Sequence, residues 1–417
     1  MPPQLMSLIG LAAFITLAWG LSVRRQQFPW RTVLAGLSLQ ALIALIMIRP
    51  SAFSAWVYEQ ANTAAANLIY FAKQGTQLIF GPLAKREALL PVFGDNDAMV
   101  LGITICGTII LVAVISSLFY HLGVLQLIVR AIAWVMQRVM RTSGSESLCT
   151  SANVFMGQTE APLIVKPYLA GMTRSELMAL MVGGMATIAG GVAAAYASLG
   201  IDAGHLLTAS LLSAPGTLVI AKLMFPETEK SATANEACEL PRSPATNSID
   251  ALCQGAADGM RMSINVIAML IAFIAMVYLA NALLAWALSW TDWTITIQEA
   301  VGWLNVPFAF MMGVPADECL RVGTVLGERV VLNEFVGYLS LSNMTTGEGA
   351  LSERTVTIAT FALCGFANFA SVAIQIGGIS TLVPERRPDL AKLGLRAMVG
   401  GLLACYLTAS VAGLLMR

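Results

Sequence analysis

Gly157-Gln158-Thr159-Glu160 is a polar tetrapeptide inside a stretch that is otherwise apolar enough to lie in a lipid bilayer. Each unsatisfied polar group at that depth costs several kcal/mol, so these side chains cannot face lipid and must line a cavity. The flanking segments 147–155 and 161–169 would each reach roughly 15 Å as helices, about half of a ~30 Å hydrocarbon core. The stretch therefore predicts a re-entrant hairpin whose tip lies at the midplane of the membrane.

The composition of the whole chain agrees with this interpretation. Of its 417 residues, 57% are hydrophobic and 12% are charged, and the mean hydropathy is +0.74. Soluble domains carry about 25% charged residues, so the sequence predicts an all-α polytopic membrane protein. The 24 basic and 24 acidic residues give a net charge of zero, which indicates no nucleic-acid partner.

Several segments are long and apolar enough to predict transmembrane helices. There are eight of them, at residues 4–21, 33–48, 99–120, 177–199, 206–225, 264–288, 355–379 and 393–415. Segments 51–90 and 124–140 mix apolar with charged residues and predict helices in the membrane interface. Lys and Arg gather in alternate short loops, which the positive-inside rule assigns to the cytoplasm. Both termini are then expected in the periplasm.

The second half of the chain repeats the plan of the first. Residues 99–225 and 262–417 each contain a span, an amphipathic segment, a hairpin with a polar tip, a span interrupted by polar residues and a last span. Three crossings per unit predict an inverted repeat with two re-entrant hairpins. Residues 1–98 are expected to form an N-terminal scaffold and residues 226–261 a cytoplasmic polar loop. This plan is typical of secondary transporters that bind their substrate at the midplane.

Glu160 and Glu334 lie at the two predicted tips and are the strongest candidates for function. An acidic side chain at mid-membrane costs at least ~2.5 kcal/mol, so it indicates a functional site unless it forms a structural ion pair. The charged residues of the second hairpin, among them Glu318, Arg321 and Arg329, are interpreted instead as structural and paired with one another.

The side chains near the tips indicate the class of ligand. They offer carboxylates, amides and hydroxyls without a cluster of Lys, Arg or His, which argues against a phosphorylated ligand. A carboxylate accepts hydrogen bonds from vicinal hydroxyls, and a Gln-Thr pair can bind an amide-like edge, so a sugar joined to a heterocycle fits. An intramembrane hydrolase is disfavoured because the two histidines, His121 and His205, lie away from the tips and lack metal-ligand spacing.

Three linked motifs make the chain resemble the concentrative nucleoside transporter family, which includes bacterial sodium/nucleoside symporters. They are Gly157-Gln158-Thr159-Glu160, Asn333-Glu334-Phe335-Val336, and Cys364-Gly365-Phe366-Ala367-Asn368-Phe369 with Ser371 and Gly377-Gly378. The resemblance runs from the third span to the last, in the family's order and spacing. It implies a multi-pass protein of the bacterial inner membrane, assembled as a homotrimer and without an organic cofactor.

The resemblance also implies which residues bind the substrate and the ion. For the nucleobase it implies Gln158, Thr159 and Glu160, with Val192 near the base. For the ribose it implies Glu334, Asn368 and Ser371, with Phe366 packing nearby. For sodium it implies the side chains of Asn153 and Thr187 and the backbone carbonyls of Met156 and Ile188. Thr187 stands where some family members have Ser, and the hydroxyl is kept.

The sequence thus predicts a sodium/nucleoside symporter whose hairpins and broken spans form a transport subdomain that moves by alternating access. Spans one to three and six would form the scaffold. Proton coupling on the same fold is the nearest alternative, with Glu160 or Glu334 titrating. A nucleoside receptor that does not transport is a less favoured third interpretation.

Overall fold

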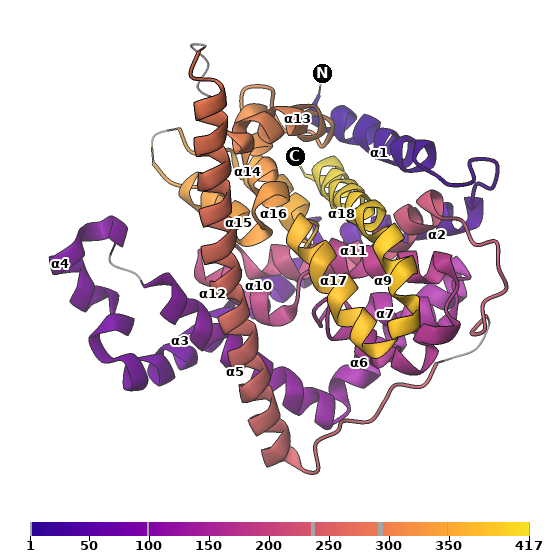
Figure 1. The fold of residues 1–417 in the computed structure, drawn as a ribbon, viewed down its shortest axis with the longest axis horizontal. Helices are drawn as coiled ribbons and strands as arrows, with labels where there is room; N and C mark the ends of the chain where they lie inside the picture. Colours follow the sequence, from indigo (N-terminus) through magenta and orange to yellow (C-terminus); the bar gives the residue numbers. More distant parts are fainter. Residues whose placement is uncertain (1, 98–99, 235–237, 291–294, 348, 417) are drawn as a thin grey trace.

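The computed structural model describes residues 2–97, 100–234, 238–290, 295–347 and 349–416. Almost all of these residues lie in helices, and the described ranges contain no strand (Figure 1). Seven of the helical segments in these ranges are long and apolar enough to cross a membrane. They are α1 (Pro3–Gly20), α2 (Trp30–Met47), α5 (Leu101–His121), α9 with α10 (Arg174–Ala186 and Gly190–Ser198), α11 (Ala203–Met224), α12 (Ser248–Ala287), and η3 with α18 (Pro384–Arg386 and Arg387–Leu415). The predicted class, an all-α polytopic membrane protein, is confirmed.

The remaining predicted span, 355–379, is built from two shorter helices. These are α16 (Glu353–Leu363) and α17 (Phe369–Leu382), separated by non-helical backbone. The interruption predicted at 365–371 is therefore present, and so is the one predicted at 187–191, where α9 ends at Ala186 and α10 begins at Gly190. A total of eight crossings stays a prediction. The first residue of the third predicted span, Met99, lies outside the described residues.

Helical segments also occupy the positions of both predicted hairpins and of the predicted interfacial segments. The first hairpin corresponds to α7 (Gly144–Ala152), α8 (Ala161–Ile164) and η2 (Lys166–Gly171), and the second to α14 (Cys319–Val331) and α15 (Glu334–Asn343). The interfacial segments correspond to α3 (Ala52–Phe80), η1 (Gly81–Ala84), α4 (Arg86–Asp97) and α6 (Val124–Met140), and the amphipathic segment of the second repeat corresponds to α13 (Ile297–Met311). Their depth in a bilayer stays a prediction.

Helix α12 begins earlier than expected. It starts at Ser248, inside the segment 226–261 that was assigned to a polar loop, and the Asn247 side chain caps it by accepting from Asp250 N–H (2.9 Å). Its buried residues over the first half are small and spaced by four: Ala251, Gly255, Gly259 and Ser263. Such a stripe lets two helices approach closely, and this one packs against α5. The additional turns of α12 at 248–263 are helical because they pack against α5.

Helices α11 and α18 lie near the middle of the protein (Figure 1), whereas α12 is largely exposed. Of the apolar window of each helix, 89% is buried for α11 and 78% for the α18 run, but only 6% for α12. The outer face of α12 carries large exposed apolar side chains, including Ile271, Tyr278 and Trp286. That face is therefore left for lipid or another subunit to cover.

Replacing Gly255 with alanine is expected to weaken the contact between α12 and α5. A Cβ atom at position 255 would lie 2.7 Å from Val114 Cα and 2.8 Å from the Ala113 carbonyl oxygen. Overpacking of this kind costs about 1–3 kcal/mol, so Gly255→Ala should lower the thermal unfolding midpoint in detergent. Gly75→Ala in α3 is the control, because that site is open and alanine favours a helix by about 1 kcal/mol. Equal midpoints for the two variants would contradict the close packing.

Candidate substrate and ion site

A series of hydrogen bonds joins the first hairpin tip to the second through the break between α16 and α17. Gln158 Nε2 donates to Ser371 Oγ (3.1 Å), and Ser371 N–H donates to Asn368 Oδ1 (2.8 Å). Asn368 Nδ2 in turn donates to Glu334 Oε2 (3.0 Å). Four of the predicted nucleoside-binding residues, from three separate parts of the chain, are thus brought together, and all four are buried.

Two asparagines explain why the second tip and the second break have these conformations. Asn333 caps α15 by accepting from Val336 N–H (3.0 Å), and Asn368 caps α17 by accepting from Ser371 N–H. Asparagine is among the most favoured residues at this position, because its side chain satisfies a free N–H group of the first turn. Glu334 is consequently the first residue of α15, where the positive end of the helix dipole stabilises a carboxylate.

Two residues of this network were missed by the sequence analysis. Tyr196 OH donates to Glu334 Oε1 (2.9 Å), and Gln375 Nε2 donates to Gln158 Oε1 (3.2 Å) and to the Met181 carbonyl oxygen (3.1 Å). The sequence contains a signal, helical spacing, for both Tyr196 and Gln375. Tyr196 follows Val192 by four residues and Gln375 follows Ser371 by four, so each lies on the same helix face as a predicted site residue.

The other predicted nucleoside-binding residues are not joined to this network by the described contacts. Thr159 is exposed at the tip, and Glu160 Oε2 accepts from the backbone N–H of Gly157 (3.2 Å) within the same turn. Val192 is buried in the first turn of α10, and Phe366 is buried in the break before α17. Their contact with a ligand stays a prediction.

The predicted sodium-binding residues lie where the first tip meets the break between α9 and α10. Phe155 at the tip accepts a backbone hydrogen bond from Gly190 N–H (3.0 Å), which fixes the tip beside the break. Asn153 is buried, and its Oδ1 atom has no hydrogen-bond partner in the described structure. The Thr187 hydroxyl donates to the Gly183 carbonyl oxygen (2.8 Å). Met156 and Ile188 lie at the tip and in the break, respectively.

The expected pairing of charges in the second hairpin is wrong for Arg329. This side chain is fully buried and forms no ion pair within the described ranges; it donates instead to the Ala362 carbonyl oxygen and toward Cys405 Sγ (3.2 Å). Glu318 accepts from Ser352, and Arg321 donates to the Gly349 carbonyl oxygen (2.5 Å). Arg329 binds the end of a broken helix because its guanidinium satisfies carbonyl groups that the helix leaves free.

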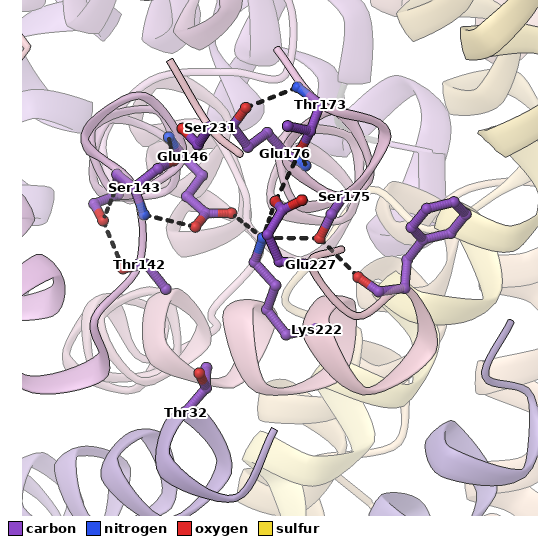
Figure 2. Close-up of polar contacts among 12 residues, drawn as sticks. Thr32, Thr142, Ser143, Glu146, Thr173, Ser175, Glu176, Lys222, Glu227 and Ser231 are labelled. Carbon is purple, nitrogen blue, oxygen red and sulfur yellow. Dashed lines mark hydrogen bonds and ion pairs between the residues drawn. The ribbon is translucent and has the colours of Figure 1, made fainter. Parts of the chain in front are cut away.

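A second polar cluster lies at the base of the first hairpin (Figure 2). It comprises Glu146, Ser175, Lys222 and Glu227, and is called the hairpin base cluster below. Lys222 Nζ lies 2.6 Å from Glu146 Oε2, 2.8 Å from Ser175 Oγ and 3.3 Å from Glu227 Oε2. The Lys222 and Glu146 side chains are only 6% and 2% exposed. This buried ion pair ties α7 of the hairpin to α9 and α11.

Glu176 extends the cluster to the loop that follows α11. Its carboxylate accepts from Thr173 N–H (2.8 Å), Ser145 Oγ (3.1 Å) and Ser231 Oγ (2.6 Å). Thr173 N–H and the Glu176 carboxylate form one half of a capping box at the start of α9. The beginning of the hairpin, the beginning of α9 and the loop are therefore held in one network.

Three family models match consecutive parts of this chain. They are described as Na+ dependent nucleoside transporter N-terminus (residues 9–83), Nucleoside recognition (103–202) and Na+ dependent nucleoside transporter C-terminus (205–413). The chain belongs to the concentrative nucleoside transporter family. It is therefore a membrane transporter and not an enzyme.

Individual relatives agree with this assignment. The chain is 39% identical over 412 residues to the uncharacterized transporter YutK of Bacillus subtilis, covering 98% of this chain and 99% of the relative. It is 36% identical to sodium/nucleoside cotransporter 2 of Rattus norvegicus, of which it covers 63%. The solved structure of CNTnw in an inward-facing substrate-bound state superposes with a TM-score of 0.91 at 37% identity, covering 99% of this chain and 97% of that one.

Removing the charge of Lys222 is expected to destabilise the protein strongly. Lys222→Met leaves Glu146 buried without its cation, and breaking a buried pair in this way costs about 3–5 kcal/mol. The double variant Lys222→Met/Glu146→Gln should recover part of the loss, because no unpaired charge then remains. Thermal unfolding midpoints in detergent are compared for wild type, the two single variants Lys222→Met and Glu146→Gln, and the double variant. A double variant no more stable than Lys222→Met would show that the two residues do not act as a pair.

Proposed function

We propose that this protein imports nucleosides across the bacterial inner membrane by sodium symport. The observation that carries this proposal is the series of hydrogen bonds from Gln158 through Ser371 and Asn368 to Glu334. It sets a residue proposed for the nucleobase next to residues proposed for the ribose. A nucleoside has the same arrangement, with a heterocycle joined directly to a sugar.

Glu334 retains the capacity to bind ribose hydroxyls. An ionised carboxylate offers about four acceptor positions, and Tyr196 and Asn368 occupy two of them. The remaining positions can accept from vicinal hydroxyls. Tyr196 and Asn368 also fix the orientation of the carboxylate before the substrate arrives, so less entropy is lost on binding.

Gln158 retains one donor and one acceptor position. Its amide has two N–H donors and two acceptor lone pairs; Ser371 takes one donor, and Gln375 takes one lone pair. The free donor and acceptor match the amide-like edge of a nucleobase. Thr159 and Glu160, on the same tip, are proposed to complete the recognition of the base, with Val192 and Phe366 as apolar neighbours.

Sodium is proposed to bind between the first tip and the first broken span. The proposed ligands are the Asn153 side chain, the Thr187 hydroxyl, and the carbonyls of Met156 and Ile188. The buried Asn153 Oδ1 atom without a partner supports this site, because such an atom costs about 1–3 kcal/mol unless a ligand or water binds it. Unwound backbone at a helix break is where coupling ions bind in related transporter architectures.

Transport is proposed to follow alternating access. The solved CNTnw structures include inward-facing, outward-facing and intermediate states, with TM-scores of 0.90 to 0.92 for this chain. The two hairpins and two broken spans would move relative to a scaffold of α1, α2, α5 and α12. A homotrimer with both termini of each subunit in the periplasm is part of the same proposal.

Uptake into proteoliposomes tests the proposed coupling. An inward sodium gradient at equal pH should drive accumulation of labelled uridine, and an inward proton gradient in sodium-free choline should not. A proton gradient should have no effect because the proposed sodium ligands are oxygen atoms of groups that do not titrate. Accumulation driven by the proton gradient alone would replace sodium with proton coupling, and nucleoside binding without uptake under either gradient would indicate a receptor.

Replacing Glu334 with glutamine is expected to weaken nucleoside binding about tenfold or more. The change removes charge-assisted hydrogen bonds, each worth about 1.5–3 kcal/mol. Isothermal titration calorimetry with uridine, and with its analogue that lacks the 3′-hydroxyl, is carried out on wild type and on Glu334→Gln. The comparison isolates the contact with the ribose. The analogue should bind wild type poorly and lose less from the substitution than uridine does. Uridine affinity within twofold of wild type, on a folded variant, would remove Glu334 from the site.

A further inference from the structure

Three buried side chains around Gly183 share an unusual property. Among the described residues, Thr150 Oγ1, Asn153 Oδ1 and Thr217 Oγ1 have no hydrogen-bond partner, although the three residues are at most 1% exposed. They come from α7, the first hairpin tip and α11. A Cβ atom built on Gly183 would lie 3.1 Å from Asn153 Nδ2, 3.7 Å from Thr150 Oγ1 and 3.6 Å from Thr217 Cγ2. The three side chains therefore surround the position of Gly183, with Thr150 Oγ1, Asn153 Nδ2 and Thr217 Cγ2 as the atoms nearest to it.

Several other buried hydroxyls in these helices are satisfied within their own helix. Ser147 and Ser151 in α7 donate to the carbonyl four residues earlier (2.7 Å each), and Thr208 in α11 does the same (2.7 Å). This bond is the ordinary solution for a helical Ser or Thr. Thr150 and Thr217 do not use it, so their hydroxyls are directed elsewhere and remain available to a ligand.

We propose that Thr150 and Thr217 bind sodium together with Asn153, forming a sodium position beside Thr187. The inference rests on the proposed sodium symport. Thr187 adjoins the same point, because its hydroxyl is bonded to the carbonyl of Gly183. Ser213, one turn before Thr217 on α11, adds another buried hydroxyl that has no partner in the described part of the chain.

The chemistry of these groups selects a monovalent cation. All the free atoms are neutral hydroxyl or amide oxygens. Calcium and magnesium sites in proteins are built with carboxylates, and transition metals prefer nitrogen and sulfur ligands; none of the three side chains provides either. Neutral oxygens suit a singly charged ion that must be released again during each transport cycle.

The test uses the variants Thr150→Val and Thr217→Val, which remove the hydroxyl and keep the shape of the side chain. Uridine binding to each variant is measured in sodium and in choline. Each variant should need at least fivefold more sodium for half-maximal uridine binding. Its uridine affinity at saturating sodium should match wild type. Sodium should also raise the thermal midpoint less than it does for wild type. Thr208→Val, on α11 with a satisfied hydroxyl, is the matched control and should keep the wild-type sodium dependence.

Serine variants distinguish loss of the hydroxyl from a general effect of substitution on folding. Thr150→Ser and Thr217→Ser retain the hydroxyl and should keep a sodium dependence close to wild type. Sodium requirements within twofold of wild type for both valine variants would overturn the inference, since the hydroxyls would then hold water or nothing. Sodium dependence absent from wild type itself would overturn the proposed symport as well, so the two failures are distinguishable.

Discussion

Broken helices in an apolar core leave backbone groups that something other than the helix must satisfy, and this requirement shapes the centre of the protein. Cys405 of α18 lies between the two breaks, with its Sγ atom 3.8 Å from the Ala186 carbonyl oxygen and 3.5 Å from that of Cys364. Arg329 donates to the Ala362 carbonyl oxygen and lies beside the same sulfur atom. One small side chain and one guanidinium therefore join the ends of α9 and α16.

The charges around these breaks complement the helix dipoles. The C-terminal end of α16 carries partial negative charge and binds Arg329, and the N-terminal end of α15 carries partial positive charge and holds Glu334. Within the described residues neither Arg329 nor Glu334 forms a direct ion pair, and the Glu334 carboxylate accepts from the neutral donors Tyr196 and Asn368.

The parts of this arrangement that could be predicted from sequence are those with local signals. The polar tips, the interruptions of two spans and the grouping of Gln158, Glu334, Asn368 and Ser371 follow from short motifs inside apolar segments. The role of Arg329 could not be predicted, because its partners lie 33 and 76 residues away and are a backbone carbonyl and a sulfur atom. No spacing rule connects such groups.

The start of α12 was missed for a different reason. Hydropathy finds apolar length, whereas residues 248–263 are helical because a stripe of small residues packs against α5. Tyr196 and Gln375 were missed although they follow site residues by one helical turn. A search of each helix face for polar neighbours of the motifs would have found both.

The length of α12 constrains how the protein sits in a membrane. Met262 Cε lies 3.9 Å from a Cβ atom built on Gly157, so α12 passes the first hairpin tip near this residue. With the tip at the midplane, as predicted, only ~15 Å of hydrocarbon lies on either side. The remaining helix, 263–287, rises roughly 37 Å and carries exposed Ile271, Tyr278 and Trp286.

For those apolar side chains all to stay within the hydrocarbon, α12 must lie about 65° from the membrane normal, well beyond the ~20° average for transmembrane helices. α12 is then a strongly tilted strut, by which we mean a helix whose two ends lie at different depths and also far apart in the membrane plane. Since Gly255 and Gly259 hold α5 against it, the strut is two helices thick where it passes the hairpin tip. In the proposed alternating access, a frame of this shape would stay in place in the bilayer while the two hairpins move past it.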